Sequence, residues 1–393
     1  MTQRIALIVL VILCFVVVTI PQIVFVRAQD AVYIHSDGTV EGTDKIQRDG
    51  DLYTFTGDIY CPIIVEKDFV VVDGAGYTLN GSGFYYREGI DLSERNNVTI
   101  KNMQICGFEY GIYLQISSMN SIYGNNITAN GFAGINMAAL TIDSVVVGCS
   151  LNSIYDNNIT GNSGEGISFH TSSENIIHDN NISSNGYDGL FLDRGSSKNA
   201  IVANNIKNND RDGIMCVIVS GSNIISGNNI SDNKHNGVTL TLNSDVNIVS
   251  ENNIHNNLHG IDINNSLYPS KNTISGNNIT NNDVGIVISQ SSGSRIYHNN
   301  FDNNDIDFLA ELGVNSLDNG SEGNYWNNYT GSDSNGDGIG DMPYVIDAEN
   351  QDNYPLMRPI EIPEFSSWAT LPIILILTLF WLVLKRSFKF LMF

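Results

Sequence analysis

The sequence predicts an all-β protein, a parallel β-helix of about 11 coils, and two recurring signals carry this prediction. The tripeptide Asn-Asn-Ile, or Asn-Asn-Phe, recurs at steps of 32, 23, 24, 24, 24, 25 and 22 residues. A glycine followed by an aliphatic residue keeps pace with it, and no stretch of this region has helical periodicity. The third residues of the tripeptide are Ile127, Ile159, Ile182, Ile206, Ile230, Ile254, Ile279 and Phe301.

Each repeat is expected to hold a short strand around Asn-Asn-Ile, a turn, and a second strand that begins at the glycine. One such unit cannot bury its apolar side alone, but stacked units bury a continuous core. With one repeat in each coil, successive Ile side chains lie about 4.8 Å apart in parallel sheets. The asparagines then form three columns, namely the two residues before each Ile and the residue three after it. Because a stacked amide donates to the next coil and accepts from the previous one, we predict that these columns are structural.

The N-terminal segment has the layout of a secretory signal. Met1–Arg4 is basic, Ile5–Ile20 is an unbroken apolar run, and Val26-Arg27-Ala28 is a small-residue exit. We predict cleavage near Ala28, which makes residues 1–28 a signal peptide; an uncleaved anchor is the alternative, because the apolar run is long. The β-helix with an N-terminal cap is then expected over residues 29–305.

The C-terminal segment, residues 361–393, predicts a linker, a transmembrane helix and a basic cytoplasmic tail. Phe365–Leu384 is 20 residues without a charge, and a helix of that length spans about 30 Å, the thickness of the hydrocarbon core. The basic cluster that follows (Lys385, Arg386 and Lys389) holds that flank inside the cell. We therefore expect the body on the extracellular face, anchored in the cell membrane by this helix.

The charge balance excludes one class of partner. The chain carries 19 Lys and Arg against 42 Asp and Glu, a net charge of −23. Nucleic-acid binding needs an excess of cations that displace counterions, so we do not expect a nucleic-acid partner. Anionic glycans face the same repulsion unless a divalent cation intervenes.

Residues 306–360 are expected to form a C-terminal cap that contains a calcium-like loop. Side-chain oxygens at alternate positions, a glycine for the sharp bend and a main-chain carbonyl match the first half of an EF-hand loop. These positions are Asp333, Asn335, Asp337, Ile339 (carbonyl) and Asp341. The twelfth position is Tyr344, so the usual bidentate glutamate is missing. We predict a structural Ca²⁺ ion, with a metal-free turn cluster as the alternative.

Three consecutive coils place an acid just before the repeated glycine: Glu165, Asp188 and Asp212. Stacked about 5 Å apart, these carboxylates repel one another unless a proton or a cation intervenes, and that spacing suits a retaining carboxylate pair. We predict them as catalytic candidates, with a solvated acidic edge as the alternative. His170, Asp193 and Arg194, expected to point outward nearby, are candidates for ligand binding.

The coil pattern, the closing segment and the stretch Val71–Leu79 (VVDGAGYTL) resemble NosD-type β-helix proteins of the pectin-lyase-like superfamily, over roughly residues 69–357. The resemblance implies a right-handed helix but is weakly specific for function. The family takes its name from a periplasmic protein implicated in supplying copper to nitrous oxide reductase, and other relatives bind or cleave carbohydrate at cell surfaces, often in archaea. Pro363-Glu364-Phe365 resembles the PEF sorting signals of archaeal surface proteins, which implies a sorting enzyme as a partner.

Three functions remain open at this point. We expect a surface-anchored β-helix that binds carbohydrate or another surface polymer. The first alternative is a polysaccharide lyase or glycoside hydrolase acting at the three stacked acids. The second is a copper-handling maturation factor like NosD, but the sequence contains no His-x-His, Cys-x-x-Cys or Met cluster, so a copper site is not expected.

Overall fold

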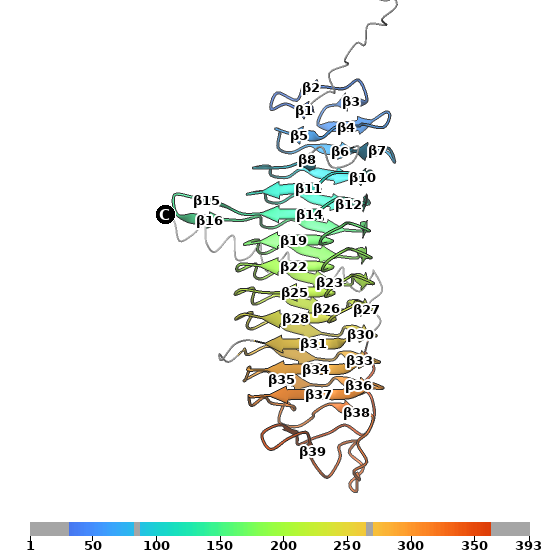
Figure 1. Ribbon diagram of the computed structural model, residues 1–393, viewed down its shortest axis with the longest axis vertical. Coiled ribbons are helices and arrows are strands. Elements are labelled where there is room, and N and C mark those ends of the chain that lie inside the picture. Colours follow the sequence, from blue (N-terminus) through green and yellow to red (C-terminus); the bar gives the residue numbers. More distant parts are fainter. Residues whose placement is uncertain (1–30, 82–86, 265–269, 363–393) are drawn as a thin grey trace, which may run out of the picture.

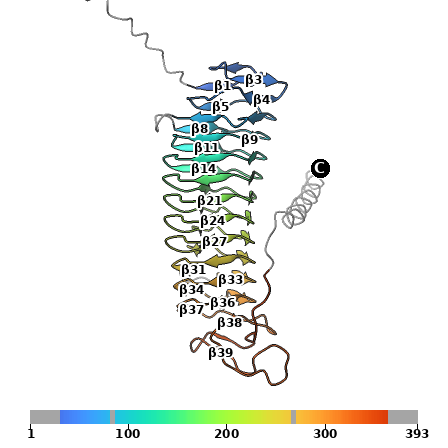
Figure 2. The same ribbon diagram turned by 90° about the vertical axis from the view of Figure 1, so that its right-hand side faces the viewer.

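Three long parallel β-sheets wind together into one rod, as the ribbon views show (Figures 1 and 2). The computed structural model describes residues 31–81, 87–264 and 270–362. Within these ranges the protein is all-β, a solenoid of about 11 turns, which confirms the predicted fold class. The described part holds no helix long and apolar enough for a membrane span. The predicted signal peptide, transmembrane helix and PEF-like segment lie outside the described residues.

Sheet A contains the strands that begin at the repeated glycine. It has 13 strands, parallel except for β2 at its edge. In spatial order they are β2 (Val40–Glu41), β1 (Val32–Ile34), β5 (Ile63–Val65), β8 (Glu88–Asp91), β11 (Tyr110–Gln115), β14 (Ala133–Ala138), β19 (Ile167–His170), β22 (Leu190–Asp193), β25 (Ile214–Cys216), β28 (Val238–Thr241), β31 (His259–Asn264), β34 (Val284–Ser289) and β37 (Ile306–Glu311).

Sheet C contains the Asn-Asn-Ile strands and has 11 members. From the C-terminal end they are β38 (Tyr325–Trp326), β36 (Asn300–Asp302), β33 (Asn278–Thr280), β30 (Asn253–His255), β27 (Asn229–Ser231), β24 (Asn205–Lys207), β21 (Asn181–Ser183), β18 (Asn158–Thr160), β13 (Asn126–Thr128), β10 (Gln104–Cys106) and β7 (Thr78–Asn80).

Sheet B was missed by the sequence reasoning, which expected two strands in each repeat where the structure has three. Its 12 strands are β3 (Ile46–Asp49), β4 (Leu52–Phe55), β6 (Val71–Asp73), β9 (Thr99–Lys101), β12 (Ser121–Tyr123), β17 (Ser153–Tyr155), β20 (Ile176–His178), β23 (Ala200–Val202), β26 (Ile224–Ser226), β29 (Ile248–Ser250), β32 (Thr273–Ser275) and β35 (Arg295–Tyr297). A single left-handed residue, such as Asp156 at φ 52° or Asp179 at φ 54°, bends the chain from sheet B into sheet C. Because one residue makes the bend, two three-residue strands fit where one was expected.

Two short antiparallel pairs complete the strand set. The hairpin of β15 (Leu140–Ile142) and β16 (Val145–Val147) projects from the rod beyond the end of β14 (Figure 1). The pair β39 (Tyr344–Val345) and β40 (Gln351–Asp352) lies in the C-terminal cap.

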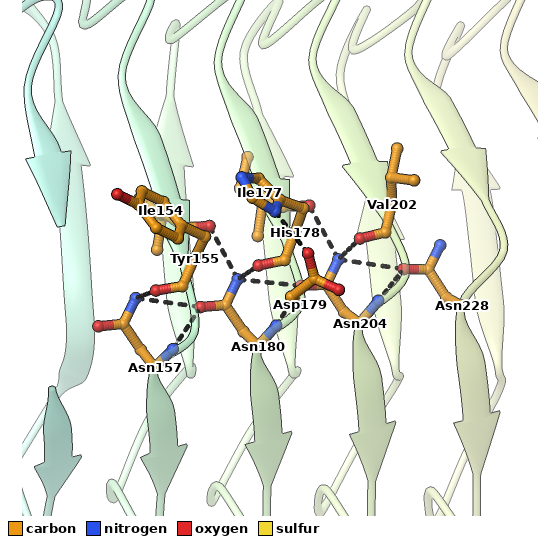
Figure 3. Close-up of polar contacts among 10 residues, drawn as sticks. All are labelled: Ile154, Tyr155, Asn157, Ile177, His178, Asp179, Asn180, Val202, Asn204 and Asn228. Atoms are coloured by element: carbon orange, nitrogen blue, oxygen red, sulfur yellow. Dashed lines mark hydrogen bonds and ion pairs between the residues drawn. The ribbon is translucent and has the colours of Figure 1, made fainter. Parts of the chain in front are cut away.

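The asparagine columns inside the rod are hydrogen-bonded ladders, as predicted (Figure 3). Asn204 is buried; its Oδ1 accepts from the backbone N–H (3.1 Å) and the Nδ2 (3.0 Å) of Asn180, and its own Nδ2 donates to Asn228 Oδ1 at 3.0 Å. Asn205, the second residue of the pair, instead lies on the outer face and donates to Asn181 Oδ1 at 2.9 Å. A further buried ladder was not predicted: Asn120, Asn152, Asn175, Asn199, Asn223, Asn247 and Asn272.

The C-terminal end of the core is closed by stacked aromatic rings. Trp326 is buried between Phe301 and Tyr344, with ring centroids 4.4 Å and 4.5 Å apart. Its indole Nε1 donates to Asp352 at 2.9 Å, and the same carboxylate receives the N–H of Asn324. The boundary between β-helix and cap at residue 305 stays a prediction. Strand pairing continues beyond this residue: β37 pairs with β34, and β38 pairs with β36.

Candidate functional site

The outer face of sheet A carries the candidate site residues. The residue after each Gly-aliphatic pair points outward, because strand side chains alternate between faces. The side chain that precedes each glycine folds over the same face. At the coil of β28, for example, Asn236 Nδ2 donates to Thr239 Oγ1 at 3.0 Å and lies 3.4 Å from Asp262 Oδ2 on β31. We call the preceding residues the acidic column: Glu165, Asp188, Asp212, Asn236 and His259.

The repeated glycine sets the backbone path at this edge. A Cβ on Gly189 would lie 2.6 Å from Gly213 O and 2.7 Å from Ile206 Cγ2, closer than any ordinary contact. Only glycine lets adjacent coils approach this closely.

Neighbouring coils of the acidic column are linked through their carboxylates. Asp188 Oδ1 accepts the backbone N–H of Asp212 at 2.9 Å, and Asp212 Oδ1 accepts that of Asn236 at 3.0 Å. Asp188 and Asp212 therefore each use one oxygen to bind the next coil.

Asp188 is the most perturbed acid of the column. It is 1% exposed, and burial, together with the nearby carboxylates of Asp212 and Glu165, raises its pKa from 3.8 to about 7. The hydrogen bond from Asp212 N–H and the charge of Arg211 oppose this rise. A carboxyl group with a pKa near neutrality is suited to give or take a proton, although its role here stays a prediction.

Replacing Asp188 by asparagine is expected to stabilise the fold at pH 8 and to change it little at pH 4. The unfolded carboxyl ionises at its ordinary pKa and the folded one only near pH 7, so the folded state loses stability as pH rises between these values. The rise in pKa corresponds to a loss of at most about 4 kcal/mol in the free energy of unfolding above pH 7. Urea unfolding at both pH values measures the difference, with Asp156→Asn on the exposed surface as the control. Equal stability of Asp188→Asn and the parent at pH 8 would contradict a buried Asp188 with a raised pKa.

His259 and Asp262 form the end of the site nearest the C-terminus. His259 Nδ1 lies 3.6 Å from Asp262 Oδ2. Burial raises the pKa of Asp262, and the His259 charge opposes this while Asp212 reinforces it. The sequence reasoning did not single out Asp262; its place directly after Gly260-Ile261 was the available signal.

His170, Asp193 and Arg194 meet on the same face, at the carboxyl ends of β19 and β22. His170 and Asp193 are register partners, and His170 Nδ1 lies 3.5 Å from Asp193 Oδ2. Arg194 Nε lies 3.2 Å from the same oxygen. In the described part of the chain no hydrogen bond or ion pair joins this group to Asp188, which lies at the opposite end of the same strand region.

Several polar atoms of this face are buried without a hydrogen-bond partner among the described residues. They are His170 Nδ1, Asp193 Oδ1, Asn236 Oδ1 and His259 Nδ1. Buried polar atoms are nearly always paired, so each exception calls for an explanation. Two of the four face a carboxylate just beyond hydrogen-bond distance: His170 Nδ1 lies 3.5 Å from Asp193 Oδ2, and His259 Nδ1 lies 3.6 Å from Asp262 Oδ2.

The predicted calcium loop folds as expected in its first half only. Asp333 accepts the backbone N–H groups of Gly336, Asp337 and Gly338, and Gly338 has the sharp-turn φ of 88°. Asp341, however, accepts from Ser332 and Ser334, and these bonds lower its pKa. All three bonds end on Asp341 Oδ2, so Oδ1 is the oxygen left to face a cation, and Ca²⁺ binding stays a prediction.

Added Ca²⁺ is expected to raise the melting temperature, because an ion that binds only the folded state stabilises it. Asp337→Ala is expected to remove that increment. The measurement is a thermal melt of EDTA-treated protein with and without Ca²⁺. Identical melting temperatures of the parent with and without Ca²⁺ would contradict a calcium ion in the cap.

The described residues do not fit a copper site. No three of their His, Cys, Asp and Glu side chains are gathered in a preformed metal-binding group, and this holds for the carboxylates of the calcium loop as well. Burial raises the pKa of the Cys149 thiol to about 11 and of the Cys216 thiol to about 12, which disfavours thiolate ligation. His178 pairs with Asp179 and stacks on Tyr155, away from the sheet A face.

Comparison with known proteins places the fold and the family. The sequence profile of NosD, described as a periplasmic copper-binding protein, matches residues 71–223 and 195–331, well over half of the chain. No curated protein matches. The family match and the structural neighbours share the right-handed parallel β-helix of the pectin-lyase-like superfamily, which confirms the predicted resemblance.

Two solved structures illustrate the likeness. The A-module of mannuronan C-5 epimerase AlgE6 from Azotobacter vinelandii has a TM-score of 0.55 at 17% identity, covering 68% of this chain and 79% of that one. The catalytic unit of a GH87 α-1,3-glucanase from Streptomyces thermodiastaticus has a TM-score of 0.50 at 12% identity, covering 67% of this chain and 61% of that one. At these identities the likeness shows the fold alone.

Proposed function

The chain belongs to the NosD family of β-helix proteins, and from this premise we propose that it binds carbohydrate on the outer face of sheet A, outside the cytoplasm. The binding surface extends from β19 to β31 and includes the acidic column, His170, Asp193, Arg194 and Asp262. An extended glycan fits a face on which similar positions recur once per coil, about every 4.8 Å.

Polar side chains that recur along this face carry this proposal. Arg194, 70% exposed, lies beside Asp193, and Asn236 bonds to Thr239 next to Asp262 on the following coil. Sugar hydroxyls both donate and accept, so one class of ligand suits guanidinium, amide, hydroxyl and carboxylate groups together.

Two further observations support a carbohydrate ligand. Tyr187, directly before Asp188, is 48% exposed and lies under the Arg211 guanidinium at 5.8 Å, so an aromatic surface borders the acidic column. The epimerase module and the glucanase catalytic unit, which share the fold at TM-scores of 0.55 and 0.50, are named for polysaccharide substrates.

The family description places NosD proteins in the periplasm, in agreement with a protein on the extracellular side. We propose in addition that Phe365–Leu384 anchors the body in the membrane, or that a sorting enzyme recognises Pro363-Glu364-Phe365 and replaces this helix. Cell fractionation tests the anchor: a chain ending at residue 362 is expected in the medium, and recovery of that truncated chain with the membrane would contradict it.

A polysaccharide lyase or glycoside hydrolase is the second candidate, favoured by the pKa of Asp188 near 7. A proton on one carboxyl and a charge on its neighbour is the arrangement that acid–base chemistry requires. Binding and catalysis at this column differ in one outcome, the release of product.

Asp188→Asn and Asp193→Asn test both candidates against a panel of neutral and acidic polysaccharides, with and without Ca²⁺. Binding predicts that the parent retains one glycan class, that each variant weakens retention by about tenfold or more (about 1.4 kcal/mol), and that no product forms. Catalysis predicts new reducing ends or unsaturated products that Asp188→Asn abolishes. His255→Gln on the outer face of sheet C is the control. Unchanged retention in both variants would refute a site on sheet A.

A further inference from the structure

Three side chains on β19 and β22 lie in the order serine, histidine, aspartate. Ser168 and His170 are two residues apart on β19, so both point outward, and Ser168 Oγ lies 3.2 Å from His170 Nε2. The other imidazole nitrogen, Nδ1, lies 3.5 Å from Asp193 Oδ2 on β22. Each nitrogen therefore faces one partner, with the hydroxyl on one side and the carboxylate on the other.

The carboxylate end of this row is buried but not fully bonded. The Asp193 side chain is 7% exposed, and its Oδ1 has no hydrogen-bond partner among the described residues. His170 Nδ1 is likewise buried and unbonded at 3.5 Å, too long for a good hydrogen bond. A small rotation of the imidazole closes this gap, and hydrogen bonds of this kind commonly tighten only when substrate is bound.

Neighbouring strands supply two further features. Asn136 on β14 is the register partner of Ser168, is buried, and has no side-chain hydrogen bond to another described residue. Its amide can therefore donate to a carbonyl oxygen held beside Ser168. On the other side Phe191 meets the His170 ring edge-on, with centroids 6.2 Å apart.

We propose that Ser168, His170 and Asp193 form a nucleophile, base and orienting acid that hydrolyse short-chain acyl esters. A triad is recognised by its geometry and roles rather than by its fold. Ser168 is only 3% exposed, at the bottom of the face between Asn136 and Phe191, so only a small acyl group such as acetyl reaches its hydroxyl.

The reaction proceeds in two balanced steps. Ser168 Oγ attacks the ester carbonyl carbon while its proton passes to His170 Nε2; the intermediate then expels the alcohol, which takes that proton. Water next attacks the acyl-serine, gives a proton to His170, and releases the carboxylic acid as Ser168 regains its proton. Asp193 holds the imidazole with Nδ1–H toward the carboxylate and stabilises the imidazolium.

This activity goes beyond carbohydrate binding. The natural ester would be an O-acyl substituent of a polymer held on sheet A, and this part of the proposal rests on the proposed function. Turnover of a small ester does not depend on it. The triad and the carbohydrate proposal can therefore be refuted independently of each other.

The test uses the full-length protein with p-nitrophenyl acetate and with methanesulfonyl fluoride, a serine label of about the size of an acetyl group. We expect label on the peptide that contains Ser168 and release of acetate by the parent protein. Ser168→Ala is expected to remove the label and to lower turnover at least about 100-fold, and Asp193→Asn to lower it by a similar or smaller factor. Ser250→Ala, an outward hydroxyl of sheet B that bonds to Ser226, is the control and is expected to retain full turnover.

Melting temperatures establish that each variant is folded. Absence of label on Ser168, or equal turnover by folded Ser168→Ala and the parent, would overturn the triad, because any ester cleavage then does not pass through Ser168. If small-ester turnover is confirmed while no glycan is retained, the triad stands and the carbohydrate proposal fails.

Discussion

Deleting Lys207–Ile230 is expected to leave a folded rod one coil shorter, whereas deleting the twelve residues Lys207–Ile218 is expected to abolish cooperative folding. Ile206 and Ile230 are register partners on β24 and β27, so the longer deletion joins equivalent positions and keeps all three sheets in register. The shorter deletion removes β25 from sheet A and leaves β22 and β28 separated by a gap. In a solenoid each coil contacts only its neighbours, so loss of a whole coil is tolerated and loss of register is not.

Circular dichroism and small-angle X-ray scattering check this pair of deletions. The 24-residue deletion should show the parent's β-sheet spectrum and a rod shorter by about 4.8 Å. Equal melting behaviour of the two deletions would contradict a solenoid held together by coil-to-coil register.

Asn204→Ala is expected to destabilise the protein by about 3–5 kcal/mol, and Asn205→Ala by less than about 1 kcal/mol. Asn204 is buried, and its Nδ2 donates to Ile177 O, Val202 O and Asn228 Oδ1 at 2.9, 3.1 and 3.0 Å. Alanine removes these three bonds and leaves the buried backbone N–H of Asn180, which donates to Asn204 Oδ1, without that acceptor. Asn205 is adjacent in sequence but lies on the outer face, where water replaces its side-chain partners.

Urea unfolding followed at equilibrium measures both variants, with hydrogen exchange of the neighbouring coils as a check that unfolding is not confined to one end. Similar losses in the two variants would contradict the division into an inner and an outer asparagine ladder.

The repeat made the fold predictable from sequence, because each Ile and each glycine must lie over its equivalent in the next coil. The third strand of each coil was not predicted, although an aliphatic residue stands five positions before the Ile of each Asn-Asn-Ile, as Ile177 stands before Ile182. It was missed because the single left-handed residue of this turn is glycine in only some coils, as at Gly124, Gly227 and Gly276, and is Asp156 or Asp179 in others, so no residue type recurs there.

The candidate site was predicted in part. Glu165, Asp188 and Asp212 stand in one column because their spacing matches the repeat, and the pairing of His170 with Asp193 follows from the same spacing. Ser168, Asn236, His259 and Asp262 were not combined with them, because burial and side-chain direction decide their contacts. The spacing of the repeat predicts neither the burial of Asp188 nor the hydrogen bond between Ser168 and His170.

Oxidative footprinting of side chains, with and without the retained glycan, tests the central claim most directly. Strand amides are already hydrogen-bonded in the rod, so side-chain labelling reports binding better than amide exchange does. The account predicts protection of Phe191, Met215 and His259 on the outer face of sheet A, and unchanged labelling of Tyr123 and Tyr155 on sheet B and of His255 on sheet C. Protection confined to sheet B or sheet C, with sheet A labelled as in the free protein, would contradict it.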